Sequence, residues 1–174
     1  MMRIRKIIRN RYSNNRGFTL IEVIAVLVIL SIIAAVIISR GMSTAEVNLK
    51  AQTEVLKSHI RYAQFRNMNM KSATALCNAS FGISIDTGLN SYSMFKDCVE
   101  ADTVILPGAD SDTVSLPNVN LSSSSAFITF DDWGVPCTDS SGTTLATSDI
   151  TITLSSAGAP NETITITKNT GFVQ

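Results

Sequence analysis

Residues 16–38 read RGFTLIEVIAVLVILSIIAAVII, and this stretch decides the fold. From Phe18 to Ile38 it holds 21 residues with a single charged side chain, Glu22. A helix of that length spans about 31 Å at about 1.5 Å per residue, close to the hydrocarbon thickness of a bilayer. The stretch is therefore predicted to cross a membrane. A carboxylate inside such a helix is costly, which suggests a function for Glu22.

The charges on either side of this stretch predict its orientation. Six of the 14 basic residues precede Gly17, and no acidic residue does. Those six are Arg3, Arg5, Lys6, Arg9, Arg11 and Arg16. The positive-inside rule places this end in the cytoplasm and the remainder of the chain outside. Without the first 17 residues the chain has eight basic and 14 acidic residues, a charge of −6 that disfavours direct binding to nucleic acid.

The junction between the basic leader and the apolar stretch carries a specific motif. It reads Arg16-Gly17-Phe18-Thr19-Leu20-Ile21-Glu22-Val23. This motif resembles the class III signal of type IV prepilins and type II secretion pseudopilins. The resemblance implies that a prepilin peptidase cuts between Gly17 and Phe18 on the cytoplasmic side and methylates the new amino terminus. It also implies that Glu22 is the family's glutamate, four residues after the cut.

The resemblance implies assembly into a fibre rather than catalysis. The Glu22 carboxylate of one subunit can pair with the Phe18 amine of a neighbour, which relieves two burial costs and sets a register. The small residues Ser31, Ala34 and Ala35 allow neighbouring helices to approach. The implied partners are other pilin or pseudopilin subunits, an inner-membrane assembly platform and the lipid bilayer. An uncleaved single-span adhesin or receptor is the alternative from another class.

The chain is expected to have a pilin-like α+β fold. Residues 1–17 form a cleaved leader, 18–39 the membrane and polymerisation helix, 40–76 an amphipathic helix continuing into the head, and 77–174 an antiparallel β head. The amphipathic segment is predicted because apolar residues recur at a helical period. Those residues are Ala45, Leu49, Leu56, Ile60, Ala63 and Met70.

The head reads as short strands joined by turns. Residues 81–86 and 91–95 flank a turn at 87–90 and predict a hairpin. Residues 149–154 and 162–167 alternate Ile with Thr, which predicts a second hairpin with its isoleucines inward. Two more strands are expected at residues 114–121 and 126–130.

Three cysteines lie in the exported part, where disulfides persist. A hairpin centred on residues 88–89 brings Cys77 close to Cys98 across the strand ends, so this pair is favoured. The alternative is Cys98 with Cys137. The spacing of the cysteines and of the single histidine, His59, does not match a zinc site, and no metal or cofactor is expected.

A second resemblance concerns the C-terminal half. Residues 130–136 read FDDWGVP, and the chain ends on an Ile-Thr alternating pair followed by NTGFV at 169–173. These features are similar to H-type minor pseudopilins and their type IV pilus counterparts, whose heads place a long helix against two antiparallel sheets. The resemblance implies a minor subunit present in few copies. A major pilin is the alternative within the class.

The remaining polar and aromatic residues of the loops favour a structural interpretation. Trp133 is expected to pack on its own turn. Several aspartates are interpreted as solvated turn carboxylates rather than calcium ligands, because they lack EF-hand spacing. They are Asp110, Asp112, Asp131, Asp132 and Asp139. The sequence contains no GxSxG, P-loop, GxGxxG or HExxH motif, so an enzyme is not expected.

Overall fold

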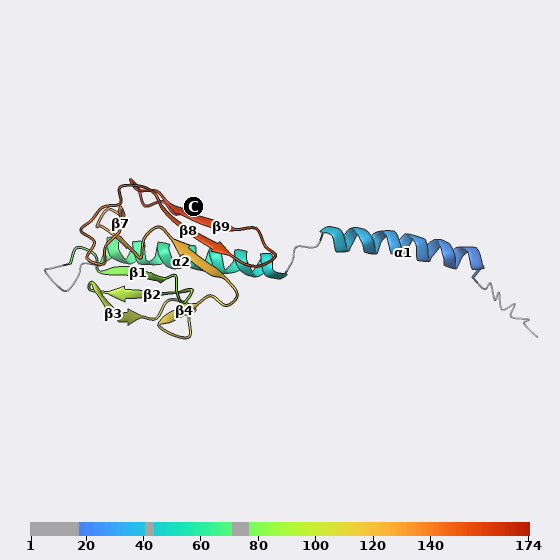
Figure 1. Cartoon of the computed structure of the whole chain (residues 1–174), viewed down its shortest axis with the longest axis horizontal. Helices are drawn as coiled ribbons and strands as arrows, with labels where there is room; N and C mark the ends of the chain where they lie inside the picture. Colours follow the sequence, from blue (N-terminus) through green and yellow to red (C-terminus); the bar gives the residue numbers. More distant parts are fainter. Residues whose placement is uncertain (1–17, 41–43, 71–76) are drawn as a thin grey trace, which may run out of the picture. The chain divides into compact units, whose positions relative to one another are not determined.

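A computed structural model of the chain describes residues 18–40, 44–70 and 77–174 (Figure 1). The chain divides into two compact units, residues 1–41 and 42–174. The first contains helix α1 (Leu20–Arg40), and the second contains helix α2 (Thr44–Asn69) and the strands. Whether one helix continues through residues 40–76, as the sequence suggests, depends on residues 41–43 and 71–76, which lie outside the described residues.

The strands of the head form two antiparallel sheets, so the predicted α+β class is confirmed. The larger sheet has the order β3-β2-β1-β6-β7, with β4 paired to β2, and the smaller has the order β5-β8-β9. The strands are β1 (Phe81–Asp86), β2 (Ser91–Lys96), β3 (Val99–Val104), β4 (Thr113–Ser115), β5 (Asn120–Ser123), β6 (Phe127–Phe130), β7 (Pro136–Cys137), β8 (Ile150–Ser155) and β9 (Glu162–Ile166).

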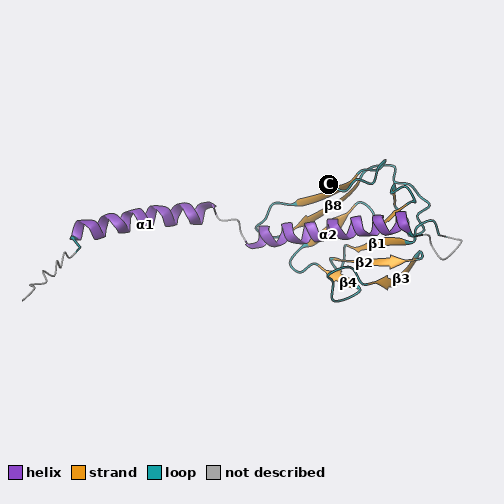
Figure 2. Ribbon diagram, turned by 180° about the vertical axis from the view of Figure 1, so that it is seen from behind, coloured by secondary structure: helices purple, strands orange, loops and turns teal. Residues whose placement is uncertain are grey.

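Helix α2 packs against both sheets. It runs along the strands, with β1, β2 and β3 on one side and β8 and β9 on the other (Figures 1 and 2). Its buried apolar residues Leu49, Leu56, Ile60 and Ala63 are those whose spacing predicted the helix. Each buried Leu or Ile contributes about 1.5–3 kcal/mol. The buried core of the described head extends from Leu49 to Val173, so the head holds this core without α1.

Both predicted hairpins are present. In the first, Phe81 lies opposite Lys96 and the turn is held by the Asp86 carboxylate, which accepts hydrogen bonds from the N–H groups of Gly88 and Leu89. In the second, the isoleucines at positions 152 and 164 face each other and are buried. In the second hairpin, alternation of Ile with Thr was therefore sufficient to predict both the pairing and the inward face.

The strand expected at residues 114–121 is wrong as a single element. It is divided between β4 and β5, which belong to different sheets. Pro117 cannot donate a ladder hydrogen bond, and Asn118 has a φ of 62°, so the backbone turns between the two strands. Strand β3 was not predicted, because its side chains are mostly exposed and show no apolar alternation.

Candidate functional site

Helix α1 presents the residues that the family resemblance singles out. Every described side chain from Phe18 to Ile37 is exposed, and α1 contains the one stretch of the described residues that is long and apolar enough to cross a membrane. Thr19 begins the helix, because its carbonyl and hydroxyl oxygens accept hydrogen bonds from Glu22 N. Gly17 lies outside the described residues.

Phe18 and Glu22 lie on the same side of α1. Together with Val23, Val26 and Leu27 they line a shallow groove on the helix surface. Phe18 immediately precedes α1, and Glu22 lies in the first turn of the helix. Both side chains are exposed, so both are accessible from this side.

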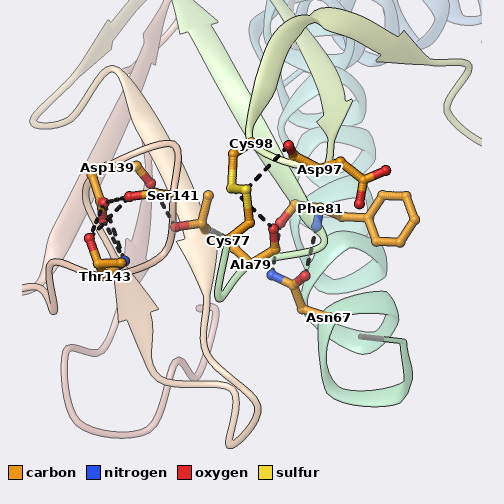
Figure 3. Close-up of a disulfide and its surroundings, with 10 residues drawn as sticks. Asn67, Cys77, Ala79, Phe81, Asp97, Cys98, Asp139, Ser141 and Thr143 are labelled. Atoms are coloured by element: carbon orange, nitrogen blue, oxygen red, sulfur yellow. Dashed lines mark hydrogen bonds between the residues drawn. A yellow bond between two sulfur atoms is a disulfide. The ribbon is translucent and has the colours of Figure 1, made fainter. Parts of the chain in front are cut away.

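The head contains a disulfide between Cys77 and Cys98, with Cα atoms 6.0 Å apart (Figure 3). This is the pairing that the hairpin register favours. The alternative partner, Cys137, is buried and makes no disulfide. Burial, with the nearby carboxylates of Asp131 and Asp139, raises the pKa of the Cys137 thiol to about 11, so this residue is not a reactive thiolate.

Asn67 joins α2 to the larger sheet beside the disulfide (Figure 3). Its Nδ2 donates to the carbonyl oxygens of Phe81 and Phe130 at 2.8 Å each, and its Oδ1 accepts from Phe81 N at 2.7 Å. The side chain is buried, and three of its hydrogen bonds go to backbone groups of β1 and β6. A polar side chain is therefore stable in this position because these bonds are made.

Asp139 organises the loop after β7 (Figure 3). Its carboxylate accepts hydrogen bonds from Ser141 Oγ, from Thr143 N and Oγ1, and from Thr144 N. Partial burial acts to raise its pKa, but these hydrogen bonds favour the ionised form and lower it to about 2. The Ser141 carbonyl in turn accepts from Asn78 N and Ala79 N, so the loop holds the segment that follows Cys77.

His59 lies on α2 and is buried against β2 and the loop after β3. Its Nδ1 lies 2.9 Å from the Tyr92 hydroxyl, and its Nε2 lies 3.1 Å from the Pro107 carbonyl oxygen. Because a carbonyl only accepts, Nε2 carries the proton and Nδ1 accepts from tyrosine. Burial raises the pKa of Tyr92. Histidine here joins three segments of the core and has the partners of a structural residue.

The acidic loops also have structural roles. Asp131 Oδ1 accepts from the N–H groups of Trp133 and Val135, and Asp112 accepts from Thr103 Oγ1. Among the residues that the structure describes, no three His, Cys, Asp or Glu side chains are grouped as metal ligands would be.

The expectation for Trp133 is wrong. Its side chain is 85% exposed rather than packed on its turn. The Asp131 carboxylate accepts hydrogen bonds from the N–H groups of Trp133 and Val135, on either side of Gly134. Sequence reasoning also missed Gln64 and Phe172, which lie beside it and line the same groove. No local pattern marks Gln64, whereas Phe172 belongs to the NTGFV segment at 169–173.

Comparison with known proteins finds similarities to the N-terminal motif and to the fold of the chain. A family model described as the prokaryotic N-terminal methylation motif matches residues 12–38. Two solved structures of the minor pseudopilin EpsH, from the type II secretion system of Vibrio cholerae, resemble the chain with a TM-score of 0.50 each. One is 11% identical and covers 73% of this chain and 94% of its own, and the other is 10% identical and covers 75% and 94%. No curated protein sequence matches the chain. The structural likeness shows the pseudopilin fold.

Proposed function

We propose that the chain, which carries the N-terminal methylation motif and a pseudopilin fold, is a member of the type IV pilin and pseudopilin family and a minor subunit of a pilus or pseudopilus. Members of this family are structural subunits that assemble with other pilin-type subunits after processing by prepilin peptidase. One observation carries the proposal: the motif at residues 12–38 occurs in the same chain as a head that has the fold of a minor pseudopilin.

In this proposal the mature chain begins at Phe18. The peptidase removes residues 1–17, residues 18–39 are stored in the inner membrane, and residues 40–76 lead into the head at 77–174. The basic leader supports a cytoplasmic N-terminus and a periplasmic or extracellular head, by the positive-inside rule. The lipid bilayer holds the subunit until an inner-membrane assembly platform inserts it into a fibre used for secretion, adhesion, motility or DNA uptake.

Glu22 is the assembly residue in this proposal. Cleavage creates a cationic amine on Phe18, and the apolar surface of α1 supplies few groups to stabilise it. The Glu22 carboxylate of an axially offset neighbour satisfies this amine, and each helix leaves both positions exposed on one side. The pairing sets the register of subunits, which is the best supported use of a buried ion pair.

The test compares Glu22→Val with Glu54→Val in cells that assemble the fibre. Glu54 is an exposed carboxylate on α2 whose ion pair with Lys57 contributes little. Glu22→Val should reach the membrane and be cleaved normally, because removing a charge eases insertion. Its ratio of fibre to membrane content should fall at least tenfold, while Glu54→Val matches wild type. Equal incorporation of both variants would refute the ion-pair mechanism.

Copy number tests the minor role. Quantitative mass spectrometry of sheared fibres should find this chain at a few per cent of the main subunit or less. A dominant band would make it a major pilin. A chain that keeps its leader and never appears in the fibre would instead be an anchored adhesin or receptor, and the family's processing would not apply to it.

A further inference from the structure

Two exposed aromatic side chains flank a groove on the head. Trp133 lies in the loop between β6 and β7 and is 85% exposed, and Phe172 lies in the C-terminal segment and is 61% exposed. The groove has a volume of about 550 Å³ and is also lined by Arg61, Gln64 and Met68 of α2. A tryptophan exposed to this degree has no role in the core, and interface hot spots are enriched in Trp and Arg.

Helix α2 fixes the backbone of both loops. Gln64 Nε2 donates to the Gly134 carbonyl at 2.9 Å and to the Gly171 carbonyl at 3.0 Å. Arg61 donates to the Val173 carbonyl at 2.8 Å. The two glycines have φ values of 82° and 63°, and a Cβ atom on Gly171 would collide with the Gly134 carbonyl. The loops are thus closely apposed, and their backbones need little further ordering when a partner binds.

The hydrogen bonds exclude one mode of recognition. The carbonyl groups of Gly134, Gly171 and Val173 already accept hydrogen bonds from α2, so they do not offer a strand edge to an extended peptide. The groove presents rings, a thioether and a guanidinium instead. Such a surface is suited to apolar side chains on a folded partner, for example one face of a helix.

The size of the surface indicates how that partner is held. Met68 of α2 also lines the groove and is 51% exposed. Trp133, Phe172 and Met68 together offer on the order of 400 Å² of apolar area, more than isolated surface residues but less than the roughly 800 Å² per partner of a stable complex. This contact alone is too small for a stable complex. It suits a partner already confined alongside, at an effective concentration in the millimolar range.

We propose that the groove between Trp133 and Phe172 is the contact site for a different pilin-type subunit, which inserts apolar side chains of its folded part. The inference rests on the proposed function, because the membrane helices of a common fibre provide the confinement that the small area requires. Met68 carries the groove onto α2, a helix on which Val47, Val55 and Phe65 are also exposed apolar residues. A second copy is not the proposed occupant, because a minor subunit has few copies of itself nearby.

The experiment places a photo-crosslinking phenylalanine derivative at position 133 of the full chain in fibre-producing cells, and separately at Leu89. Leu89 is the matched control, since it is 75% exposed and apolar but lies in the β1–β2 turn. Irradiation should give an adduct at position 133 at least tenfold above the control. Its partner peptide should belong to a different chain with an N-terminal methylation motif. The adduct should disappear when Glu22→Val is added.

Substitution provides the second measurement. Trp133→Ser should reduce incorporation into the fibre about tenfold, as expected for loss of one hot-spot side chain, while Leu89→Ser has no effect. Both variants should keep the wild-type unfolding free energy to within about 0.5 kcal/mol, because both side chains are exposed.

Several results would overturn the inference. They are an adduct no stronger than the control, an adduct with a second copy or with a protein lacking the motif, and normal incorporation of Trp133→Ser. Failure of the proposed function has a separate sign: the wild-type chain would keep its leader and would not appear in the fibre. If Glu22→Val fails to assemble and Trp133→Ser assembles normally, the groove assignment is wrong and the proposed function stands.

Discussion

Replacing Asp139 by Asn tests how the loop after β7 is stabilised. The substitution keeps the shape of the side chain and one acceptor oxygen, but it removes the charge. In the variant, the side-chain amide NH₂ group would face hydrogen-bond donors. They include Thr143 N and Ser141 Oγ, from which the wild-type carboxylate accepts. Hydrogen bonds to a charged group contribute about 1.5–3 kcal/mol, so the head should lose about 2 kcal/mol of unfolding free energy at neutral pH.

The pH dependence follows from the direction of the pKa shift. The pKa of Asp139 is about 2 in the folded head and 3.8 ordinarily, a difference equivalent to about 2.4 kcal/mol. The carboxylate is partly exposed, and water screening reduces this to about 1–2 kcal/mol. Because the folded pKa is the lower one, the stabilisation is present above about pH 4 and is lost as the pH falls toward 2.

Urea unfolding of residues 42–174 at pH 7, 4 and 2.5 measures this contribution. The difference in unfolding free energy between wild type and Asp139→Asn should be largest at pH 7. It should become much smaller by pH 2.5, where the wild-type carboxyl is increasingly protonated. Asp110→Asn is the control, because Asp110 is an exposed loop carboxylate whose substitution should leave the curve unchanged. A difference that is absent at pH 7, or that stays constant down to pH 2.5, would refute the reasoning.

Three further predictions concern cleavage of the leader and the stability of the head. Gly17→Val should leave the 17-residue leader attached, because a β-branched side chain obstructs the peptidase site; intact mass of membrane-extracted protein measures it, and a cleaved product would contradict it. Asn67→Leu should lower the unfolding free energy by about 2–4 kcal/mol, since it leaves buried backbone groups of β1 and β6 unpaired; an unchanged urea midpoint would contradict this. Replacing Cys77 and Cys98 together by Ser should cost about 3 kcal/mol by opening the loop between two residues 21 positions apart, and equal stability of the reduced and oxidised head would count against it.

The parts of the fold that were predictable are those encoded by local periodicity. The apolar spacing of α2 and the Ile-Thr alternation of β8 and β9 each repeat over enough residues to distinguish a helix from a strand. The disulfide followed from the same signal, because the register of the first hairpin places Cys77 near Cys98. Strand β3 had no such signal. Its pairing with β2 is irregular, with a register shift between Phe95 and Lys96, and its exposed side chains obey no alternation.

Trp133 shows where reasoning from neighbouring residues in the sequence fails, at a surface that we propose binds a partner. A Trp-Gly pair in a loop usually packs on its own turn, and nothing nearby in the sequence says otherwise. Gln64 holds the backbone of the loop that carries Trp133, because its amide binds the Gly134 carbonyl 70 residues away and the Gly171 carbonyl 107 residues away. A single amide therefore places two loops that are unrelated in sequence, and Gln64→Leu should release both. The position-133 crosslink proposed above should then weaken although position 133 itself is unchanged, because Gln64 positions the loop and Trp133 is the side chain proposed to make the contact.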